Sequence, residues 1–400
     1  MSKPFEGVKV LDFTQVLAGP FCAENMAYLG ADVIKIEQPN QGDQTRAMLG
    51  DPAQQDLKLG PYFLAMNAGK RSMTLDLKHP RAKGVIYKLA EKADVLLQNF
   101  KAGTMERFGL GYADLKKVNP DLVYCSISGY GQTGPKAGVA AYDSAIQGAS
   151  GMMSATGYPD KGPTRIGFQA IDMMTGMTAA FAISAALFRR TKGEGGEHVD
   201  VPLYDTALTM MAPLVGDFMN FGTEARLVGN GAQAGLPAVD TFKTEDGYYS
   251  VAAATPAQFS GLCRCLGLDE LAKDERLSSM AEQIRRADEI RRAMAGVFLS
   301  RPTAFWVETL GQAKIPGAAV RTFAEALSDE QLEHRDLFIK LRPEGFEQEV
   351  TVLNTAFSLQ ETETGTTVPP PRLGQHTEDI LQQAGFSPDE IRSLVEDQAV

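Results

Sequence analysis

The first half of the chain alternates between strand-type and helix-type hydrophobic periodicity, and this alternation constrains the fold more than any other feature. Residues 8–13 are predicted to form a strand, residues 20–29 a short helix ended by Gly30, and residues 32–37 a second strand. The pattern continues with strands at 72–77, 94–97 and 122–127 and with helices at 80–92 and 103–108. Strands that alternate with helices at this spacing predict an α/β fold, with a mainly parallel sheet covered by helices on both faces.

The second half departs from this pattern and indicates a further, smaller domain. A helix of small residues is predicted at 171–187, followed by a strand at 198–203 and a Met-rich helix. The Gly- and Ala-rich stretch 226–238 has no clear period, which suits a linker or an active-site loop. A charged helical region over 257–309 is predicted to belong to the smaller domain.

The charge balance limits the partners. The chain carries 50 Asp and Glu against 39 Lys and Arg, a formal net charge of −11, which disfavours nucleic acids and anionic membranes. Residues 1–6 lack the apolar core of a signal peptide, and the longest apolar-leaning run, 178–188, is shorter than the ~20 residues that span a bilayer. We therefore expect a cytoplasmic protein that acts on neither nucleic acid nor membrane, although a local basic pocket for one small anion is compatible with this charge.

Neither a metal site nor a disulfide framework is indicated. Of the four cysteines, only Cys263 and Cys265 are close in sequence, and the four histidines lack the i, i+4 spacing of a metal site. The sequence therefore predicts no metal and ordinary thiols.

Two glycine-containing segments follow predicted strands and are candidates for binding phosphate. The segment 129–134 satisfies the G-x-G-x-x-G pattern, but Pro135 follows where a dinucleotide fingerprint requires a helix, so we expect no NAD. The junction 12–20 contains Gly19 at a helix start, where backbone N–H groups can bind phosphate. A tight turn also needs a glycine, and both explanations stay open.

A series of short motifs runs in order along almost the whole chain. They lie at 10–20, 30–37, 42–46, 67–72, 75–78, 99–100, 107–109, 128–131, 193–204, 315–320 and 373–377. Together these motifs resemble those of the class III CoA-transferases, the family of formyl-CoA transferase and the carnitine CoA-transferase. The resemblance implies an enzyme that moves CoA from an acyl-CoA thioester to a small carboxylic acid, with coenzyme A as its co-substrate.

The resemblance also implies an architecture. Members of the family have a Rossmann-type large domain built from both ends of the chain, a small middle domain, and two subunits threaded through each other as linked rings. We expect residues 1–222 to form the amino-terminal part of the CoA-binding large domain and 223–335 the small domain with its linkers. Residues 336–400 are expected to return and complete the large domain, in a homodimer.

The family's nucleophile is an aspartate that starts a small-residue helix, and by resemblance Asp172 holds this position. A carboxylate suits the reaction, because it can accept an acyl group as a mixed anhydride and then CoA as a thioester. We expect the helix dipole to keep this carboxylate ionised. The alternative is that Asp172 only caps the helix, a role worth ~1 kcal/mol of stability. By resemblance, the turn at Gln15, Val16 and Ala18 supplies part of the oxyanion pocket, which makes Gln15 the second catalytic candidate.

Further positions match the CoA site of the family. Lys and Arg side chains suit phosphates and Phe suits adenine, although each residue could also be an ordinary surface side chain. Gln38 stands where some members have an arginine, and Ala140 where formyl-CoA transferase has a lysine. The candidate CoA-binding residues are Val16, Ala18, Gln38, Lys70, Arg71, Asn99, Phe100, Met105 and Arg107.

The acid substrate is the feature that the sequence determines least. The run of consecutive glycines that forms a mobile flap in the oxalate-using members is absent, and residues 229–235 are a looser substitute. With Tyr142, Phe168 and Met173 predicted to line the pocket, we expect a C4 or C5 dicarboxylate or a medium acyl chain rather than oxalate.

Two alternative functions are compatible with the same resemblance. The α-methylacyl-CoA racemases of this superfamily exchange an α-proton and place a histidine in the segment that matches 141–143, whereas this chain has no histidine between His79 and His198. A non-catalytic acyl-CoA-binding protein would lack the nucleophile, whereas Asp172 is present. Transfer of CoA is therefore the preferred prediction.

Overall fold

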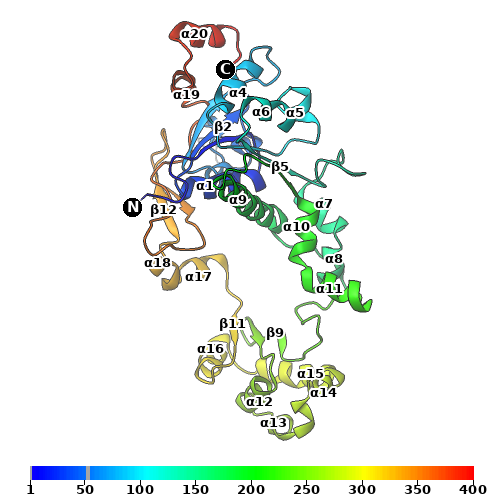
Figure 1. The fold of residues 1–400 in the computed structure, drawn as a ribbon. Coiled ribbons are helices and arrows are strands. Elements are labelled where there is room, and N and C mark those ends of the chain that lie inside the picture. The colour runs from blue at the N-terminus through cyan, green and yellow to red at the C-terminus, as the bar shows by residue number, and fades with distance from the viewer. Residues whose placement is uncertain (1, 51–54) are drawn as a thin grey trace. The chain divides into compact units, whose positions relative to one another are not determined.

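The computed structural model describes residues 2–50 and 55–400, which form two compact units (Figure 1). The larger unit consists of Met1–Ser150, Ile166–Ala212 and Glu330–Val400, and the smaller unit of Gly151–Arg165 and Pro213–Asp329. Both chain ends therefore belong to the larger unit. The smaller unit also includes a segment, Gly151–Arg165, that lies outside the range expected for the small domain.

A six-stranded sheet with the order β3-β2-β1-β4-β5-β8 forms the centre of the larger unit, and all its neighbouring strands are parallel. Its strands are β1 (Lys9–Asp12), β2 (Asp32–Glu37), β3 (Lys70–Thr74), β4 (Val95–Gln98), β5 (Val123–Ser128) and β8 (His198–Pro202). The predicted parallel α/β sheet is confirmed. The strand order reverses between β1 and β4, which is where open α/β sheets leave a crevice for ligands at their carboxyl edge.

Helices cover the sheet because most strand residues carry apolar side chains on both faces. On one face, Leu11 of β1 and Leu96 of β4 share a core with Ile380 and Leu394, which come from the end of the chain. The helices of the larger unit and its remaining elements are α1 (Ala18–Tyr28), η1 (Gln44–Ala47), α3 (Pro61–Leu64), α4 (Ala82–Ala90), α5 (Thr104–Arg107), α6 (Tyr112–Val118), α7 (Asp143–Ala149), α9 (Ala170–Arg190), α10 (Leu203–Met210), α18 (Glu330–His334), β12 (Phe338–Leu341), β13 (Val350–Leu353), α19 (Thr377–Gln383) and α20 (Pro388–Glu396).

Helix α9 is longer than the helix predicted at 171–187 and than the apolar run at 178–188. It has 21 residues, and among the described residues it is the one helix long and apolar enough to cross a membrane by length and composition. A core helix passes the same test, and α9 packs on α1. At Gly176 the approach is so close that a Cβ atom would lie 2.5 Å from the Ala18 carbonyl oxygen.

The smaller unit has its own core, in which the rings of Phe242 and Phe298 stack with centroids 4.8 Å apart and Trp306 packs against Phe298. The region 257–309, which the sequence indicated as helical, contains several separate helices. The elements of this unit are α8 (Met152–Ala155), β6 (Gly157–Tyr158), β7 (Gly162–Pro163), α11 (Ala212–Phe221), β9 (Val239–Lys243), β10 (Tyr248–Ala252), α12 (Pro256–Cys265), α13 (Asp269–Lys273), η2 (Glu275–Ser278), α14 (Met280–Arg285), α15 (Ala287–Phe298), α16 (Thr303–Gln312), β11 (Gly317–Ala319) and α17 (Phe323–Leu327).

Candidate active site

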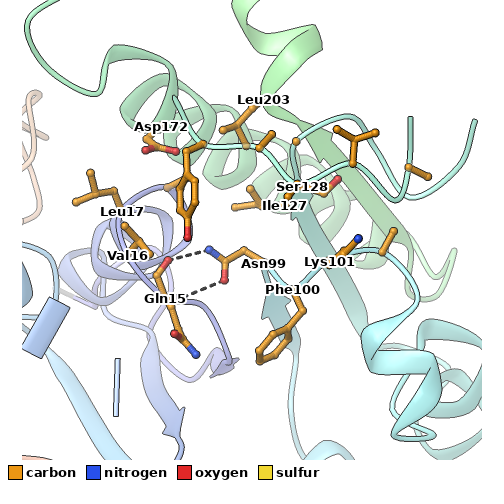
Figure 2. Close-up of a pocket in the computed structure, with 18 of the residues that line it drawn as sticks. Gln15, Val16, Leu17, Asn99, Phe100, Lys101, Ile127, Ser128, Asp172 and Leu203 are labelled. Carbon is orange, nitrogen blue, oxygen red and sulfur yellow. Dashed lines mark hydrogen bonds between the residues drawn. The ribbon is translucent and has the colours of Figure 1, made fainter. Parts of the chain in front are cut away.

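A cavity of about 300 Å³ lies at the carboxyl edge of the sheet in the larger unit. Its wall is formed at the carboxyl ends of three neighbouring strands (Figure 2). Residues 15–18 follow β1, residues 99–102 follow β4, and residues 127–129 end β5. Asp172 of α9 completes this wall and is the one acidic side chain in the lining. The cavity lies beside the reversal of strand order, where the fold favours a ligand site.

The turn after β1 is held by hydrogen bonds from outside itself. The backbone N–H of Gln15 donates to Asn99 Oδ1 (3.0 Å) and its carbonyl accepts from Asn99 Nδ2 (2.8 Å), as Figure 2 shows. The N–H of Val16 donates to the carboxylate of Asp43, with both oxygens at 3.3 Å. The Val16 N–H thus already has a partner in this structure, and the oxyanion role of the turn stays a prediction.

The side chain of Gln15 lines the cavity but extends away from Asp172 (Figure 2). A direct catalytic contact between Gln15 and Asp172 is thus not formed here. Ala18 begins α1, which has no side-chain cap, and the first N–H groups of an α-helix have no partner within it. Ala18 lines the cavity, and the donors at the start of α1 are the N–H groups of Ala18 and Gly19, because Pro20 has no N–H and the N–H of Phe21 already donates to the Leu17 carbonyl.

Asp172 is in the first turn of α9, and a second carboxylate lies directly behind it. Asp143, the first residue of α7, is buried and accepts hydrogen bonds from the N–H groups of Ile171 (2.8 Å) and Asp172 (3.2 Å). Its other oxygen accepts from Gln147 Nε2 (2.6 Å). Asp143 therefore caps α9 from a neighbouring helix. In the sequence, this role is indicated only weakly, by an acidic residue beside Tyr142.

The acidity of Asp172 differs from the sequence-based expectation. Burial raises the pKa of Asp172 to about 7, and the negative charge of Asp143 contributes in the same direction. The helix dipole was expected to keep Asp172 ionised, but Asp143 occupies the N–H groups through which the dipole acts most strongly. Protonated Asp172 is therefore favoured more than for an ordinary aspartate.

Comparison with known proteins decides the family. The chain matches the model of CoA-transferase family III over residues 5–377. This chain belongs to the class III CoA-transferases. The family's enzymes use acyl-CoA as co-substrate, and the family and the names of its relatives indicate that this chain is a transferase.

Relatives of this chain include CoA-transferases that are named for different acid substrates. A mouse (Mus musculus) succinyl-CoA:glutarate CoA-transferase is 34% identical over 95% of this chain and 86% of its own length. An acetyl-CoA:oxalate CoA-transferase from Acetobacter aceti is 35% identical over 84% of this chain and 86% of its own length. Among solved structures, a CAIB/BAIF family protein from Brucella suis matches with a TM-score of 0.83 and 31% identity, covering 96% of this chain and 100% of that one.

The structure brings together many of the residues that the sequence selected. The candidates that line the cavity of this transferase are Gln15, Val16, Ala18, Asn99, Phe100, Tyr142 and Asp172. Phe168 and Met173 flank the start of α9 but do not line the cavity, and Phe168 is exposed. Gln38 is exposed after β2 and lies outside the lining.

A phosphate-binding role for Lys70 is wrong. Its side chain is fully buried, and the ammonium binds Asp12 Oδ2 (3.1 Å), the Pro20 carbonyl (2.9 Å) and Asn67 Oδ1 (2.9 Å). These three contacts use all three donors of the ammonium. Lys70 therefore stabilises the contact of β1 and β3 with α1.

The remaining CoA candidates differ in their surroundings. Arg71 pairs with Asp32 (2.7 Å), the first residue of β2, so it lies toward the amino edge of the sheet rather than at the cavity. Met105 is buried in the core and does not line the cavity, and its place in the CoA site stays a prediction. Arg107 is exposed on α5, where it donates to Thr104 Oγ1 (3.0 Å), and its role in binding CoA stays a prediction.

Lys101 was not among the predicted residues, yet it is the one cation that lines the cavity. It follows Asn99 and Phe100 directly, and Figure 2 shows it on the far side of Asn99 from Asp172. The cavity thus holds one acidic and one basic side chain. Within residues 2–50 and 55–400, no group of three or more His, Cys, Asp or Glu side chains could hold a metal ion.

Proposed function

We propose that this chain transfers CoA from an acyl-CoA thioester to a small dicarboxylic acid through covalent intermediates on Asp172. The observation that carries the proposal is the position of Asp172, the one carboxylate in the lining of the cavity at the carboxyl edge of the sheet. A carboxylate nucleophile is what a double exchange between thioester and acid requires.

The reaction is a sequence of acyl transfers. The Asp172 carboxylate attacks the donor thioester carbonyl, the C–S bond breaks, and CoA thiolate leaves behind an acyl-aspartyl anhydride. The thiolate then attacks the aspartyl carbonyl, which forms an aspartyl-CoA thioester and releases the donor acid as its carboxylate. The acceptor carboxylate displaces the thiolate to form a second anhydride. Attack of the thiolate on the acceptor carbonyl yields the new acyl-CoA and regenerates Asp172, with no net gain or loss of protons.

Each tetrahedral intermediate places negative charge on an oxygen that needs hydrogen-bond donors. The start of α1 supports such a site, because Ala18 lines the cavity and no side chain caps the N–H groups of Ala18 and Gly19. Gly176 lies one turn after Asp172 on α9 and contacts Ala18 of α1. Residues four apart share one face of a helix, so this contact holds the start of α1 near Asp172.

The lining of the cavity and the relatives support a dicarboxylate acceptor. The wall combines apolar groups such as Val16 and Leu203 with the polar groups of Asn99, Ser128 and Lys101. The ammonium of Lys101 is suited to an anionic group of the ligand. Glutarate and oxalate are substrates named for relatives of this chain, and we propose a C4 or C5 acid as the first acceptor to test.

We also propose that two chains form the interlocked homodimer that the family resemblance implies. Exposed apolar side chains on α9 support an interface there, since Phe181 is 77% and Phe188 64% exposed. Monomeric soluble proteins rarely expose such large apolar groups together.

The proposed function is tested by supplying succinyl-CoA with a panel of carboxylates and identifying acyl-CoA products by mass. Asp172→Ala should abolish transfer without unfolding the protein, and hydroxylamine added during turnover should modify the wild-type enzyme at Asp172. Asp121→Ala is the matched control, because Asp121 is an exposed aspartate in the turn before β5. An Asp172→Ala variant that keeps more than about a hundredth of the activity would contradict the assignment.

A further inference from the structure

The turn between β1 and α1 has its backbone polar groups held by side chains from three other segments. The Thr14 carbonyl accepts a hydrogen bond from Lys35 Nζ (2.7 Å), and Asn99 binds both the N–H and the carbonyl of Gln15. The N–H of Val16 is bound by Asp43. The turn has no regular secondary structure, so its conformation depends on these side-chain hydrogen bonds.

Val16 needs this support because its backbone is strained. Its φ is +71°, in the left-handed region that a β-branched residue rarely adopts. Such a conformation costs on the order of 1–3 kcal/mol and persists only where the surroundings fix it. A turn released from its side-chain contacts is expected to relax to another conformation.

Lys35 and Asp43 bind each other as well as the turn. Their charged atoms are 3.0 Å apart, and both side chains are fully buried. Burial alone would raise the pKa of Asp43, but Lys35 and the hydrogen bonds from Thr45 hold it below its ordinary value, so the pair is ionised. The contacts form a closed ring that runs from the Thr14 carbonyl through Lys35 and Asp43 to the Val16 N–H.

Stability alone is a weak reason for a buried ion pair. Replacing both partners of such a pair by apolar side chains is often neutral or stabilising, because the charges no longer have to be desolvated. The turn that this pair holds leads directly into α1, whose uncapped start borders the cavity and is kept near Asp172 by the contact between Gly176 and Ala18.

We propose that Lys35 and Asp43 are a positioning pair, which holds the strained turn at 14–16 so that the start of α1 can stabilise oxyanions formed at Asp172. The proposal rests on the proposed function of Asp172. Neither residue touches the substrate, since neither lines the cavity. Their effect should therefore fall on kcat, where the transition state is stabilised, and not on the binding of acyl-CoA.

The decisive variant removes both charges at once. Lys35→Met combined with Asp43→Leu should fold, because no unpaired charge stays buried, but its kcat should fall about 100-fold, as expected for a misplacement of about 1 Å near the reacting atoms. The KM for acyl-CoA should stay within about threefold of the parent value. Asp43→Asn keeps an oxygen acceptor for the Val16 N–H and should lose less of its kcat than the double variant.

The control removes a partly exposed ion pair at the amino edge of the sheet, away from the cavity. Arg190 and Asp94 are 2.7 Å apart, and Arg190→Met combined with Asp94→Leu should leave kcat unchanged. A folded Lys35→Met/Asp43→Leu protein with kcat within about threefold of the parent overturns the proposal. If that variant does not fold, Lys35→Met combined with Asp43→Ala, which also removes both charges and the acceptor for the Val16 N–H, decides by the same criterion.

Failure of the proposed function gives a different result. In that case Asp172→Ala keeps its activity, whatever the Lys35 and Asp43 variants do. If Asp172→Ala is inactive and the Lys35 and Asp43 variants keep full kcat, only the positioning role is wrong.

Discussion

Asp143 and Asp172 meet at the start of α9, where one carboxylate caps the helix and the other faces the cavity. Burial raises the pKa of Asp172 to about 7, and the negative charge of Asp143 adds to this effect. A nucleophilic carboxylate must be ionised, so activity should rise with pH through this value. Burial and the charge of Asp143 thus limit the ionised fraction of the nucleophile.

Asp143→Asn tests this coupling. Removing the negative charge beside Asp172 favours its ionised form, so the acidic limb of the pH profile for kcat/KM should move to lower pH. The profile is measured from about pH 5 to about pH 9, with an acceptor acid that is fully ionised across this range. An unchanged limb would show that Asp143 does not set the acidity of Asp172. Some loss of stability is expected, since one hydrogen bond with Gln147 is replaced by a repulsive contact.

Asp172→Asn tests the same environment through stability. The pKa of Asp172 is raised on folding, so the unfolded chain ionises first and the wild-type protein loses stability as pH rises from about 4 to about 7. The variant lacks this group and should not show that loss. The melting temperature of the variant should therefore exceed that of the wild type at about pH 8 and be similar to it at about pH 4. An equal difference in melting temperature at both pH values would contradict this.

At the scale of elements, the contact between α1 and α9 depends on glycine. A Cβ at Gly176 would lie 2.5 Å from the Ala18 carbonyl and 3.0 Å from the Phe21 ring, so Gly176→Ala must push the helices apart. We expect a loss of about 1–3 kcal/mol in the free energy of unfolding and a lower kcat, because the start of α1 moves away from Asp172. Chemical denaturation and steady-state kinetics measure the two effects.

Gly84 provides the control for this substitution. It lies inside α4, in the same unit, and a Cβ there would meet nothing within 4 Å. Gly84→Ala should therefore stabilise the protein by about 0.5–1 kcal/mol without changing kcat. If Gly176→Ala leaves the free energy of unfolding unchanged, the two helices can move apart without loss of stability.

Sequence patterns were sufficient for the parallel sheet and for most of the cavity, because strand periodicity and the turns after β1, β4 and β5 are local properties. Lys70 shows where such reasoning fails. A lysine in a basic motif resembles a phosphate ligand, but its position at the start of β3 directs it into the sheet, where it meets Asp12. The capping role of Asp143 could not be predicted for a similar reason, because its partners at 171 and 172 are close to it only in the folded chain.

At the scale of the whole molecule, the larger unit is closed by the end of the chain. Ile380, Leu381 and Leu394 of α19 and α20 are buried in the same core as β1. The N–H of His376 donates to the Ser72 carbonyl (2.9 Å), so the return segment also binds along β3. Each of these apolar side chains contributes roughly 1.5–3 kcal/mol, which together is a large part of the stability of a typical domain.

This closure makes a prediction for the proposed interlocked dimer. If two chains are threaded through each other, they can part only when the return segment leaves the core of one subunit. Exchange between differently tagged dimers should therefore be slow under native conditions and should accelerate with denaturant in parallel with the unfolding of the larger unit. Leu381→Ala, which should cost about 2–5 kcal/mol, is expected to speed this exchange.

Leu353→Ala is the control, because Leu353 is 57% exposed and its truncation leaves the core intact. Exchange is followed by native mass spectrometry of mixed tagged dimers, and unfolding by fluorescence or circular dichroism under the same conditions. Rapid exchange while the larger unit remains folded would rule out threading, because an ordinary interface separates without opening either core. The rate of exchange thus separates a threaded dimer from a dimer that is held only by its surface.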